Sequence, residues 1–334
     1  MLIPPFTISV AFVRGMLSGI CAGGACPDEW LLQAGIPPEL LEEPAGRVTA
    51  EQYVTLFGVL MEQRDDEGLG FFSRPLRHGS IALVMRNALS ATTVESAVRR
   101  LSQGFQLLQD DVRFETMREE DLTGLSFRVP AAYYPDRVFV HELLLRVFSR
   151  LVVWLHGGRI RPFGFDFAYR SPPQADEYCR LFRGRVRFDQ AQSAVWFPTV
   201  DLLAPMRRDD AALRAFLLQS PRKVVIPQRN EDATSERIRA YLQQVRPQWP
   251  DLAATADALN MSVGTLQRHL ANENRSFQMV KDQLRRDLAI VRLTTSTVQL
   301  AALASELGFS DQAVFQRAFK AWTGSAPGTY RQRR

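Results

Sequence analysis

The sequence predicts a multidomain protein, with an α/β (α+β) N-terminal domain followed by an all-α C-terminal domain. Strand-like alternation recurs between residues 112 and 197, whereas a pattern of two short helices occurs twice after residue 250. The chain has 334 residues, 46% of them hydrophobic and 23% charged, which is enough for about two domains with buried cores. We predict domains at residues 1–220 and 234–334, joined by a linker at 221–233.

Residues 1–110 are predicted to be mostly helical, because apolar residues recur at helical spacing between breaks that contain Gly and Pro. The expected helices cover residues 6–21, 29–34, 50–63, 80–90 and 93–109. Two strands, 112–117 and 122–129, flank an acidic turn and predict a hairpin. The rest of the domain is predicted to contain a helix at 137–155, a strand at 163–169, a short helix at 175–182, and a pair of strands at 186–188 and 194–197.

The C-terminal part contains one pattern of two helices twice, at residues 251–270 and 299–330, after a helix at 235–245. In the second copy, Gly308 stands where a left-handed residue ends a helix, and Ser310 is expected to cap the next helix. A shift of 48 positions aligns Leu259 with Leu307, and one more residue aligns Leu266 with Phe315. Such a repeat rarely arises by chance, and two helices at a sharp turn predict a helix-turn-helix in each copy.

Residues 276–294 are predicted to form a helix that connects the two copies. Its apolar residues recur at spacings of three and four, which predicts one buried stripe: Phe277, Val280, Leu284, Leu288 and Val291. A helix of this length spans about 27 Å, comparable with the roughly 34 Å that separate successive major grooves on one side of DNA. A rigid connector could therefore hold two recognition helices over neighbouring grooves.

The positive charge is concentrated in the part of the chain that contains the repeat. Residues 221–334 contain 17 Lys and Arg against 10 Asp and Glu, which leaves 24 basic and 26 acidic residues for positions 1–220. An excess of this kind is expected for a surface that faces phosphates, although basic faces are often merely solvated.

The sequence offers little support for a metal site, a membrane span or an enzyme. Cys21, Cys26 and Cys179 cannot all pair, and we expect reduced, mostly buried thiols in a cytoplasmic protein. No segment approaches the roughly 20 uninterrupted apolar residues of a membrane-spanning helix. The four histidines have no metal-ligand spacing, and no nucleotide-binding or nucleophile motif is present. We therefore expect no catalytic residues, no cofactor and no bound metal.

The second helical pair and its C-terminal extension resemble the signature of AraC/XylS-type transcription regulators. The matching residues are Gly308, Phe309, Ser310, Phe315, Phe319, Lys320, Gly324, Pro327, Tyr330 and Arg331. The resemblance implies a cytoplasmic, sequence-specific regulator that binds double-stranded promoter DNA, with RNA polymerase as a further partner. It favours activation over repression.

The N-terminal part is similar to the arabinose-binding-like sensor domain of the same regulators, through the stretches 68–101, 183–198 and 202–210. This resemblance implies a domain that binds a small-molecule effector and forms homodimers. A domain that only oligomerises, without a ligand, is the alternative. The sequence does not identify the residues of an effector pocket.

The family pattern assigns candidate roles to outward-facing residues of both helix-turn-helix copies. The residues expected to contact base edges are Thr265, Gln267 and Arg268 in the first copy and Gln312, Gln316 and Arg317 in the second. Those expected at phosphates are Ser262, Arg275, Lys281, Arg285, Ser310, Lys320 and Arg331, together with the terminal Arg333 and Arg334. The alternative for each is an ordinary solvated side chain. Gly264 replaces a longer base-contacting residue of many relatives, and Asn274 replaces a Gly whose left-handed geometry Asn tolerates.

Overall fold

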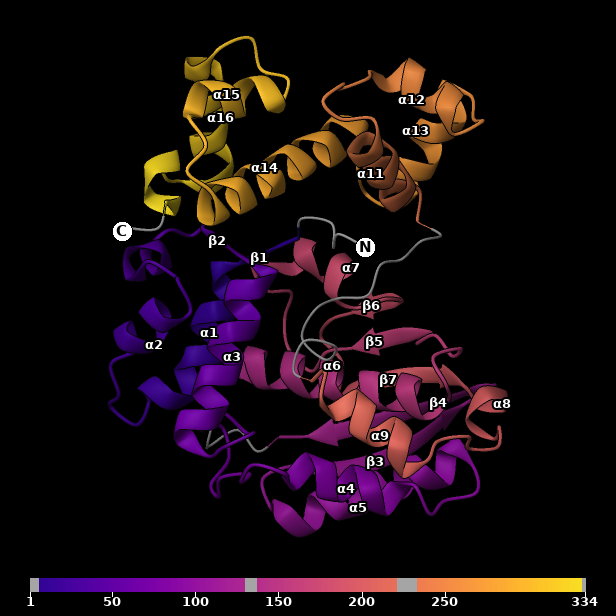
Figure 1. Ribbon diagram of the computed structural model, residues 1–334. Helices are drawn as coiled ribbons and strands as arrows, with labels where there is room; N and C mark the ends of the chain where they lie inside the picture. The colour runs from indigo at the N-terminus through magenta and orange to yellow at the C-terminus, as the bar shows by residue number, and fades with distance from the viewer. Residues whose placement is uncertain (1–5, 130–136, 221–232, 332–334) are drawn as a thin grey trace. The chain divides into compact units, whose positions relative to one another are not determined.

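The computed structural model describes residues 6–129, 137–220 and 233–331, which form two compact units (Figure 1). The helix-turn-helix unit contains Met1–Val10, Gly35–Tyr53 and Gln228–Arg334, and the sheet unit contains Ala11–Ala34 and Val54–Pro227. The chain therefore passes between the units four times. Residues 221–232 of the expected linker lie outside the described residues, so the linker stays a prediction.

The sheet unit is built on five strands in the order β3-β4-β7-β5-β6. The predicted hairpin is confirmed, since β3 (Arg113–Glu119) and β4 (Leu122–Arg128) pair in antiparallel register. The predicted pairing of the last two strands is wrong. The strand β7 (Ser193–Pro198) lies between β4 and β5 (Gly164–Asp166), while β6 (Arg185–Arg187) pairs with β5 in parallel at the edge.

Helices α5 and α6 cover one face of this sheet. The helix α5 (Val94–Leu108) begins at Thr93, whose side chain forms a capping box with Ser96, and α6 spans Arg137–Leu155, the predicted range. The rings of Phe105 on α5 and Phe148 on α6 contact Phe114 of β3 at centroid distances of 5.4 and 4.2 Å. The remaining helices are α1 (Val10–Cys21), α2 (Asp28–Gln33), α3 (Ala50–Arg64), α4 (Ser80–Ala88), η2 (Ala175–Glu177), α7 (Tyr178–Leu181), α8 (Thr199–Leu202) and α9 (Asp210–Leu217).

The helix-turn-helix unit confirms the predicted repeat. Its helices are α11 (Thr234–Gln244), α12 (Leu252–Ala258), α13 (Val263–Asn272), α14 (Phe277–Thr295), α15 (Leu300–Glu306), α16 (Gln312–Thr323) and η3 (Pro327–Tyr330). The turn residues Asn260 and Gly308, 48 positions apart, are both left-handed, with φ of 55° and 74°. The N-cap of α16 is Asp311 rather than Ser310, because the Asp311 carboxylate accepts the hydrogen bond from the Val314 N–H. Compared with the first copy, the second copy therefore has one more residue between its left-handed turn residue and the N-cap of its second helix.

A short N-terminal ribbon belongs to the same unit as these helices. Its strands, β1 (Thr7–Ser9) and β2 (Arg47–Thr49), pair in antiparallel register, and η1 (Pro38–Glu42) precedes β2. The expected helix at 6–21 is therefore correct only from Val10 onwards. Its first residues instead satisfy their backbone groups by pairing with residues about 40 positions away.

The ribbon contacts α14 through a buried network of polar groups. Asp287 on α14 has no exposed surface and forms an ion pair of 2.6 Å with Arg239 of α11. Its other carboxylate oxygen accepts a hydrogen bond from the hydroxyl of Thr7. Arg47 holds Thr7 in place through its Nε, at 2.7 Å, and its backbone N–H donates to the hydroxyl of Tyr330. The network thus joins both ends of the chain around the connector helix.

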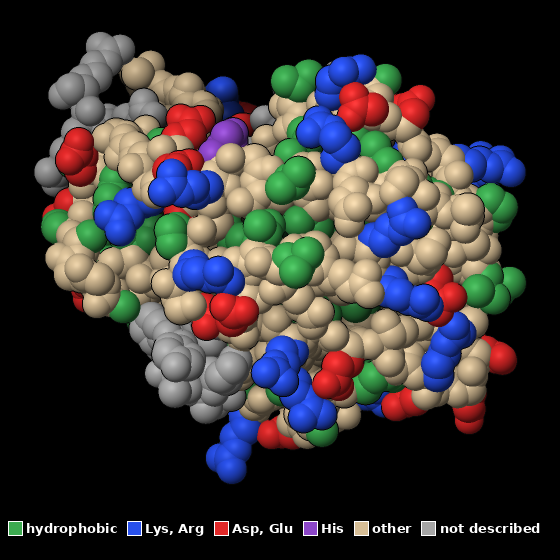
Figure 2. Space-filling model, turned by 90° about the horizontal axis from the view of Figure 1, so that it is seen from below, with side chains coloured by type: hydrophobic (Ala, Val, Ile, Leu, Met, Phe, Trp, Pro, Cys, Tyr) green, Lys and Arg blue, Asp and Glu red, His purple; other side chains and the backbone are tan. Residues whose placement is uncertain are grey.

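The surface of the sheet unit mixes charges of both signs. Figure 2 shows Lys and Arg side chains interspersed with Asp and Glu over the face viewed there. Cys21 is half-buried and Cys26 is exposed, both as free thiols, so the expectation of buried cysteines is wrong for Cys26. Within the described ranges, no helix is both long and apolar enough to span a membrane.

Candidate nucleic-acid interface

The helices α13 and α16 are the second helices of the two helix-turn-helix copies, and they lie at opposite ends of α14 (Figure 1). The 19 residues of α14 correspond to a length of about 28 Å. Of the predicted stripe, Val280, Leu284 and Leu288 are buried, whereas Phe277 and Val291 are half-buried. One rigid helix thus supports both candidate recognition helices.

On α13, an apolar face holds the helix in place and leaves a polar face open. Leu266 and Leu270 are buried, whereas Gln267 and Arg268 are exposed. The Ser262 hydroxyl caps the helix by accepting a hydrogen bond from the Thr265 N–H, and it also contacts the half-buried Thr265 hydroxyl at 2.8 Å. The α13 surface therefore presents an amide and a guanidinium beside a fixed cap.

Val263, the first residue of α13, is a candidate contact that the sequence analysis missed. Its side chain is 39% exposed at the start of the helix, where the first turn of a recognition helix meets the bases. An apolar side chain there can contact the methyl group of thymine. No atom lies within 4 Å of a Cβ added at Gly264, so this position leaves open space on the same surface.

On α16, the same arrangement recurs with aromatic residues on the buried side. Phe315 and Phe319 are fully buried, with ring centroids 5.7 Å apart, while Gln312 and Arg317 are exposed and Gln316 is half-buried. Hydrogen bonds from the backbone of the first turn lower the pKa of the capping Asp311 carboxyl group. The cap is therefore ionised at neutral pH and stabilises the start of the helix.

The candidate phosphate contacts differ in whether their side chains already form hydrogen bonds within the protein. Lys320 is exposed on the last turn of α16. Arg331 donates to the carbonyl oxygen of Val298 at 2.6 Å, and Arg275 donates to the side chain of Gln283 at 3.2 Å. Ser310 contacts the Asp311 carboxylate. Residues 333 and 334 lie outside the described residues.

The side chains of Lys281 and Arg285 point into the helix-turn-helix unit and contact other residues there. The Lys281 ammonium group donates to the carbonyl oxygens of Trp249 and Pro250, both at 3.0 Å. The Arg285 guanidinium lies between the rings of Trp249 and Phe309, at 4.8 and 5.0 Å from their centroids. Burial lowers the pKa of both groups. Arg285 thus connects the segment before the first copy with the turn of the second.

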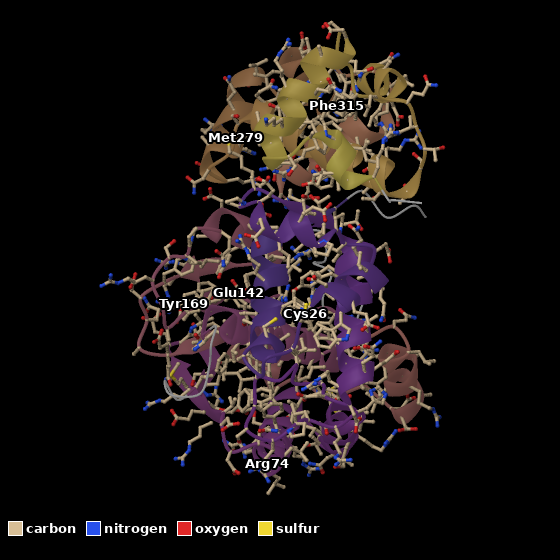
Figure 3. All side chains as sticks on the ribbon, turned by 90° about the vertical axis from the view of Figure 1, so that its left-hand side faces the viewer. Cys26, Arg74, Glu142, Tyr169, Met279 and Phe315 are labelled. Atoms are coloured by element: carbon tan, nitrogen blue, oxygen red, sulfur yellow. The ribbon has the colours of Figure 1, made fainter. Side chains whose placement is uncertain are left out.

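The sheet unit contains two sets of buried polar side chains. Tyr178 donates to the buried Glu142 carboxylate and contacts the Tyr169 hydroxyl at 3.0 Å, while His141 contacts the hydroxyl of Ser193 at 2.6 Å. Glu142 and Tyr169 are labelled in Figure 3. These polar groups are satisfied within the core, as structural residues would be. Among the described residues, no group of three or more His, Cys, Asp and Glu could hold a metal ion.

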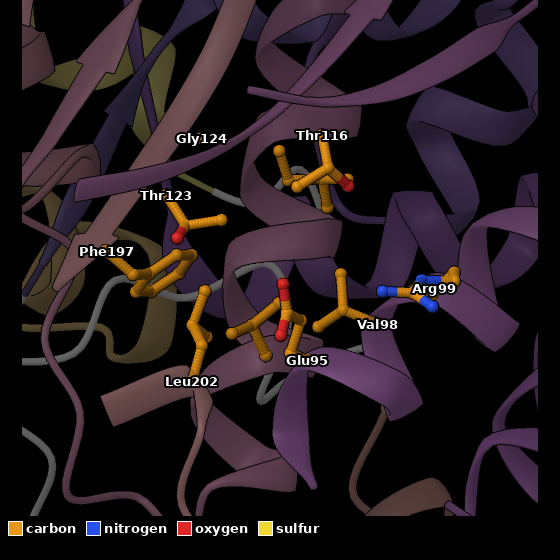
Figure 4. Close-up of a pocket in the computed structure, with 10 residues that line it drawn as sticks. Glu95, Val98, Arg99, Thr116, Thr123, Gly124, Phe197 and Leu202 are labelled. Atoms are coloured by element: carbon orange, nitrogen blue, oxygen red, sulfur yellow. The ribbon is translucent and has the colours of Figure 1, made fainter. Parts of the chain in front are cut away.

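A small cavity lies between α5, α8 and the sheet (Figure 4). Its volume is about 70 Å³, and Val98, Phe197 and Leu202 are among its lining residues. The Glu95 carboxylate at its edge forms an ion pair with Arg118 at 2.7 Å. Such a space accommodates water molecules rather than a metabolite.

Comparison with known families decides the identity of this architecture. Residues 24–206, more than half of the chain, match the model of the arabinose-binding domain of AraC transcription regulators, and residues 255–333 match a helix-turn-helix domain. The chain belongs to the AraC family of transcription regulators. The predictions of the family, of the fold class and of a non-enzymatic, DNA-binding protein are confirmed.

The similarity of this regulator to characterised proteins extends over nearly its whole length. It is 26% identical over 326 residues to the ornithine utilization regulator of Pseudomonas aeruginosa, which covers 97% of this chain and 96% of the relative. It is 25% identical over 323 residues to the regulator VirS of Mycobacterium tuberculosis, with 92% and 91% covered. The crystal structure of the regulator CdpR from Pseudomonas aeruginosa aligns with 96% of this chain and 98% of its own, at 23% identity and a TM-score of 0.34.

Proposed function

We propose that this regulator binds a double-stranded operator through both helix-turn-helix copies and acts as a cytoplasmic, homodimeric activator that works with RNA polymerase. The observation that supports this most directly is the pair of exposed polar faces on α13 and α16, at equivalent positions of an internal repeat. Each face presents glutamine and arginine side chains that are not engaged in hydrogen bonds with the described residues. Glutamine pairs with adenine and arginine with guanine in the major groove.

Within this proposal the candidate residues have separate roles. Base edges are contacted by Thr265, Gln267, Arg268, Gln312, Gln316 and Arg317, with Val263 as an added apolar contact. Phosphates are contacted by Ser262, Arg275, Ser310, Lys320 and Arg331. We leave out Lys281 and Arg285, because both are directed into the unit.

Variants of Arg317 and Lys320, which both lie on α16, should distinguish the two kinds of contact. Replacing Arg317 by alanine should relax specificity at one base position, at a cost of about 1–3 kcal/mol on the preferred sequence. Replacing Lys320 by alanine should weaken binding to all sequences alike and reduce the salt slope by about 1. The measurement is an operator titration at several salt concentrations with every single-base variant. Equal losses on all sequences for both variants would contradict the assignment.

We propose further that a small metabolite bound to the sheet unit controls DNA binding, and that basic amino acids are the first class to test. The match to the arabinose-binding domain family supports effector control, and the relative named for ornithine utilization supports the choice of basic amino acids. The alternative is a sheet unit that only oligomerises.

A thermal-shift experiment with full-length protein distinguishes these two possibilities. Ligand at 100 times its Kd should stabilise the folded protein by about 2.7 kcal/mol. L-Ornithine should raise the melting temperature and change operator affinity, whereas D-glucose serves as a control of another chemical class. A protein that dimerises and binds its operator but responds to no metabolite would favour the alternative.

A further inference from the structure

We propose that a groove on the face of the five-stranded sheet opposite α5 and α6 is the effector site, and that it binds a short zwitterion with a carboxylate at one end and an amino group at the other. The inference rests on the effector control proposed above and identifies its site and chemistry. The groove has a volume of about 450 Å³, within the roughly 300–1,000 Å³ of small-molecule sites.

The strand register places the groove opposite the core. Phe114 faces α5 and α6, so the alternate residues of each strand face the other way. On that side, Trp196 of β7, Gly164 of β5 and Arg185 of β6 form one row across three neighbouring strands. A Cβ added at Gly164 would lie 2.9 Å from the carbonyl oxygen and 3.5 Å from the Cβ of Arg185, so the glycine allows β6 to approach β5 closely at this point of the row. The same residues line the groove.

A buried carboxylate fixes the floor of the groove before any ligand arrives. Asp166, 5% exposed, accepts hydrogen bonds from Nε and Nη2 of Arg187 at 2.6 and 2.7 Å and from Nε1 of Trp196 at 2.7 Å. The hydrogen bond with Asp166 raises the pKa of Arg187. A side chain that is already held in place loses little entropy on binding, which favours affinity.

Opposite charges stand at the two edges of the sheet, on either side of this floor. Arg185 belongs to the edge strand β6, whereas Glu119 and Glu120 lie at the end of the other edge strand, β3. In the part of the chain that the structure describes, none of these three side chains forms a hydrogen bond or an ion pair, and all three line the groove. Four strand spacings separate the edges by about 19 Å, and long side chains from both edges reduce that span.

This charge pattern selects the ligand. Arg185 can hold a carboxylate through two parallel hydrogen bonds, and the glutamates can hold an ammonium group. The half-exposed Phe163 at the rim offers apolar surface to a methylene chain between the two ends, whereas Trp196, which also lines the groove, is only 3% exposed. A dicarboxylate would be repelled by the glutamates, and a diamine by Arg185. An α,ω-diamino acid satisfies both ends.

Three related probes test the ligand class by calorimetric titration of the full-length protein. L-Ornithine has both charged ends, 1,4-diaminobutane is ornithine without its carboxylate, and L-norvaline is ornithine without its side-chain amino group. We expect ornithine to bind and each of the other two to bind at least about tenfold more weakly, since each loses one charge-assisted contact. If none of the three binds, or if all three bind equally, the ligand class is wrong.

Substitutions on the groove test its location. Arg185→Ala should weaken ornithine binding about tenfold or more, and Arg185→Glu should in addition allow 1,4-diaminobutane to bind. The double variant Glu119→Gln/Glu120→Gln should also weaken ornithine binding. Arg77→Ala removes an 82% exposed charge elsewhere on the unit and should change nothing. Unchanged affinity for ornithine in the groove variants would overturn the site but not effector control, and operator binding without ligand tests DNA recognition separately.

Discussion

Replacing Asp287 by alanine is expected to lower the free energy of unfolding of the helix-turn-helix unit by about 3–5 kcal/mol. Asp287 is fully buried and pairs with Arg239, whose side chain is only 6% exposed. The substitution would leave that guanidinium without its carboxylate and the Thr7 hydroxyl without its acceptor. Since whole domains are stable by about 5–15 kcal/mol, this loss is a large share. Urea unfolding followed by circular dichroism measures it.

A control variant on the same helix shows whether the loss of stability comes from the burial of the ion pair or only from the removal of a negative charge. Asp282 is 30% exposed and lies 3.9 Å from Arg285, so Asp282→Asn should cost no more than about 1 kcal/mol. Replacing both buried partners, as in Arg239→Met/Asp287→Leu, should restore part of the stability lost in Asp287→Ala, because no uncompensated ion of that pair remains. An unfolding midpoint for Asp287→Ala equal to that of Asp282→Asn would refute the role given to the buried network.

Phe315→Ala is expected to destabilise the second helix-turn-helix copy by about 3–5 kcal/mol and to abolish its contribution to operator binding. The ring is fully buried and contacts Phe309 and Phe319 at centroid distances of 5.6 and 5.7 Å. Removing it leaves a cavity beneath α16, and the exposed face of that helix depends on this packing. Thermal melting and operator titration measure the two effects.

Two further variants calibrate this result. Phe315→Leu retains most of the apolar volume and should cost less than about 1.5 kcal/mol. Met279→Ala removes an apolar side chain that is 49% exposed on α14, and its effect should stay within about 0.5 kcal/mol. Figure 3 shows Met279 at the edge of the unit and Phe315 within it. Equal losses for Met279→Ala and Phe315→Ala would contradict the assigned core.

The sequence predicts well those elements whose signal is local. The α6 range, 137–155, follows from its apolar periodicity, and the repeat reveals both helix-turn-helix copies through an offset of 48. The ribbon strands β1 and β2 have three residues each, too few for alternation to appear, and their partners lie about 40 positions apart. The pairing of β6 with β5 was missed because sequence neighbours were expected to pair, whereas β7 inserts between β4 and β5.

The candidate nucleic-acid interface was likewise predictable only where the sequence signal is local. Periodicity identifies which residues of α13 and α16 point outward, as the exposed Gln267, Arg268 and Arg317 illustrate. It does not show that Trp249 and Phe309, 60 positions apart, enclose Arg285. The proposed effector groove was not predictable either, because Glu119 and Glu120 lie 66 and 65 positions before Arg185 in the chain, at the opposite edge of the sheet.

The ribbon that contacts α14 also determines where this protein can be divided. Exchanging N-terminal domains between regulators at the segment around residue 230 would deprive Asp287 of Thr7 and Tyr330 of Arg47. A hybrid regulator should therefore retain residues 1–10 and 35–53 together with the C-terminal helices and accept foreign sequence only in the intervening segments. The helix-turn-helix unit would therefore have to be transferred to another regulator as three separate segments of the chain.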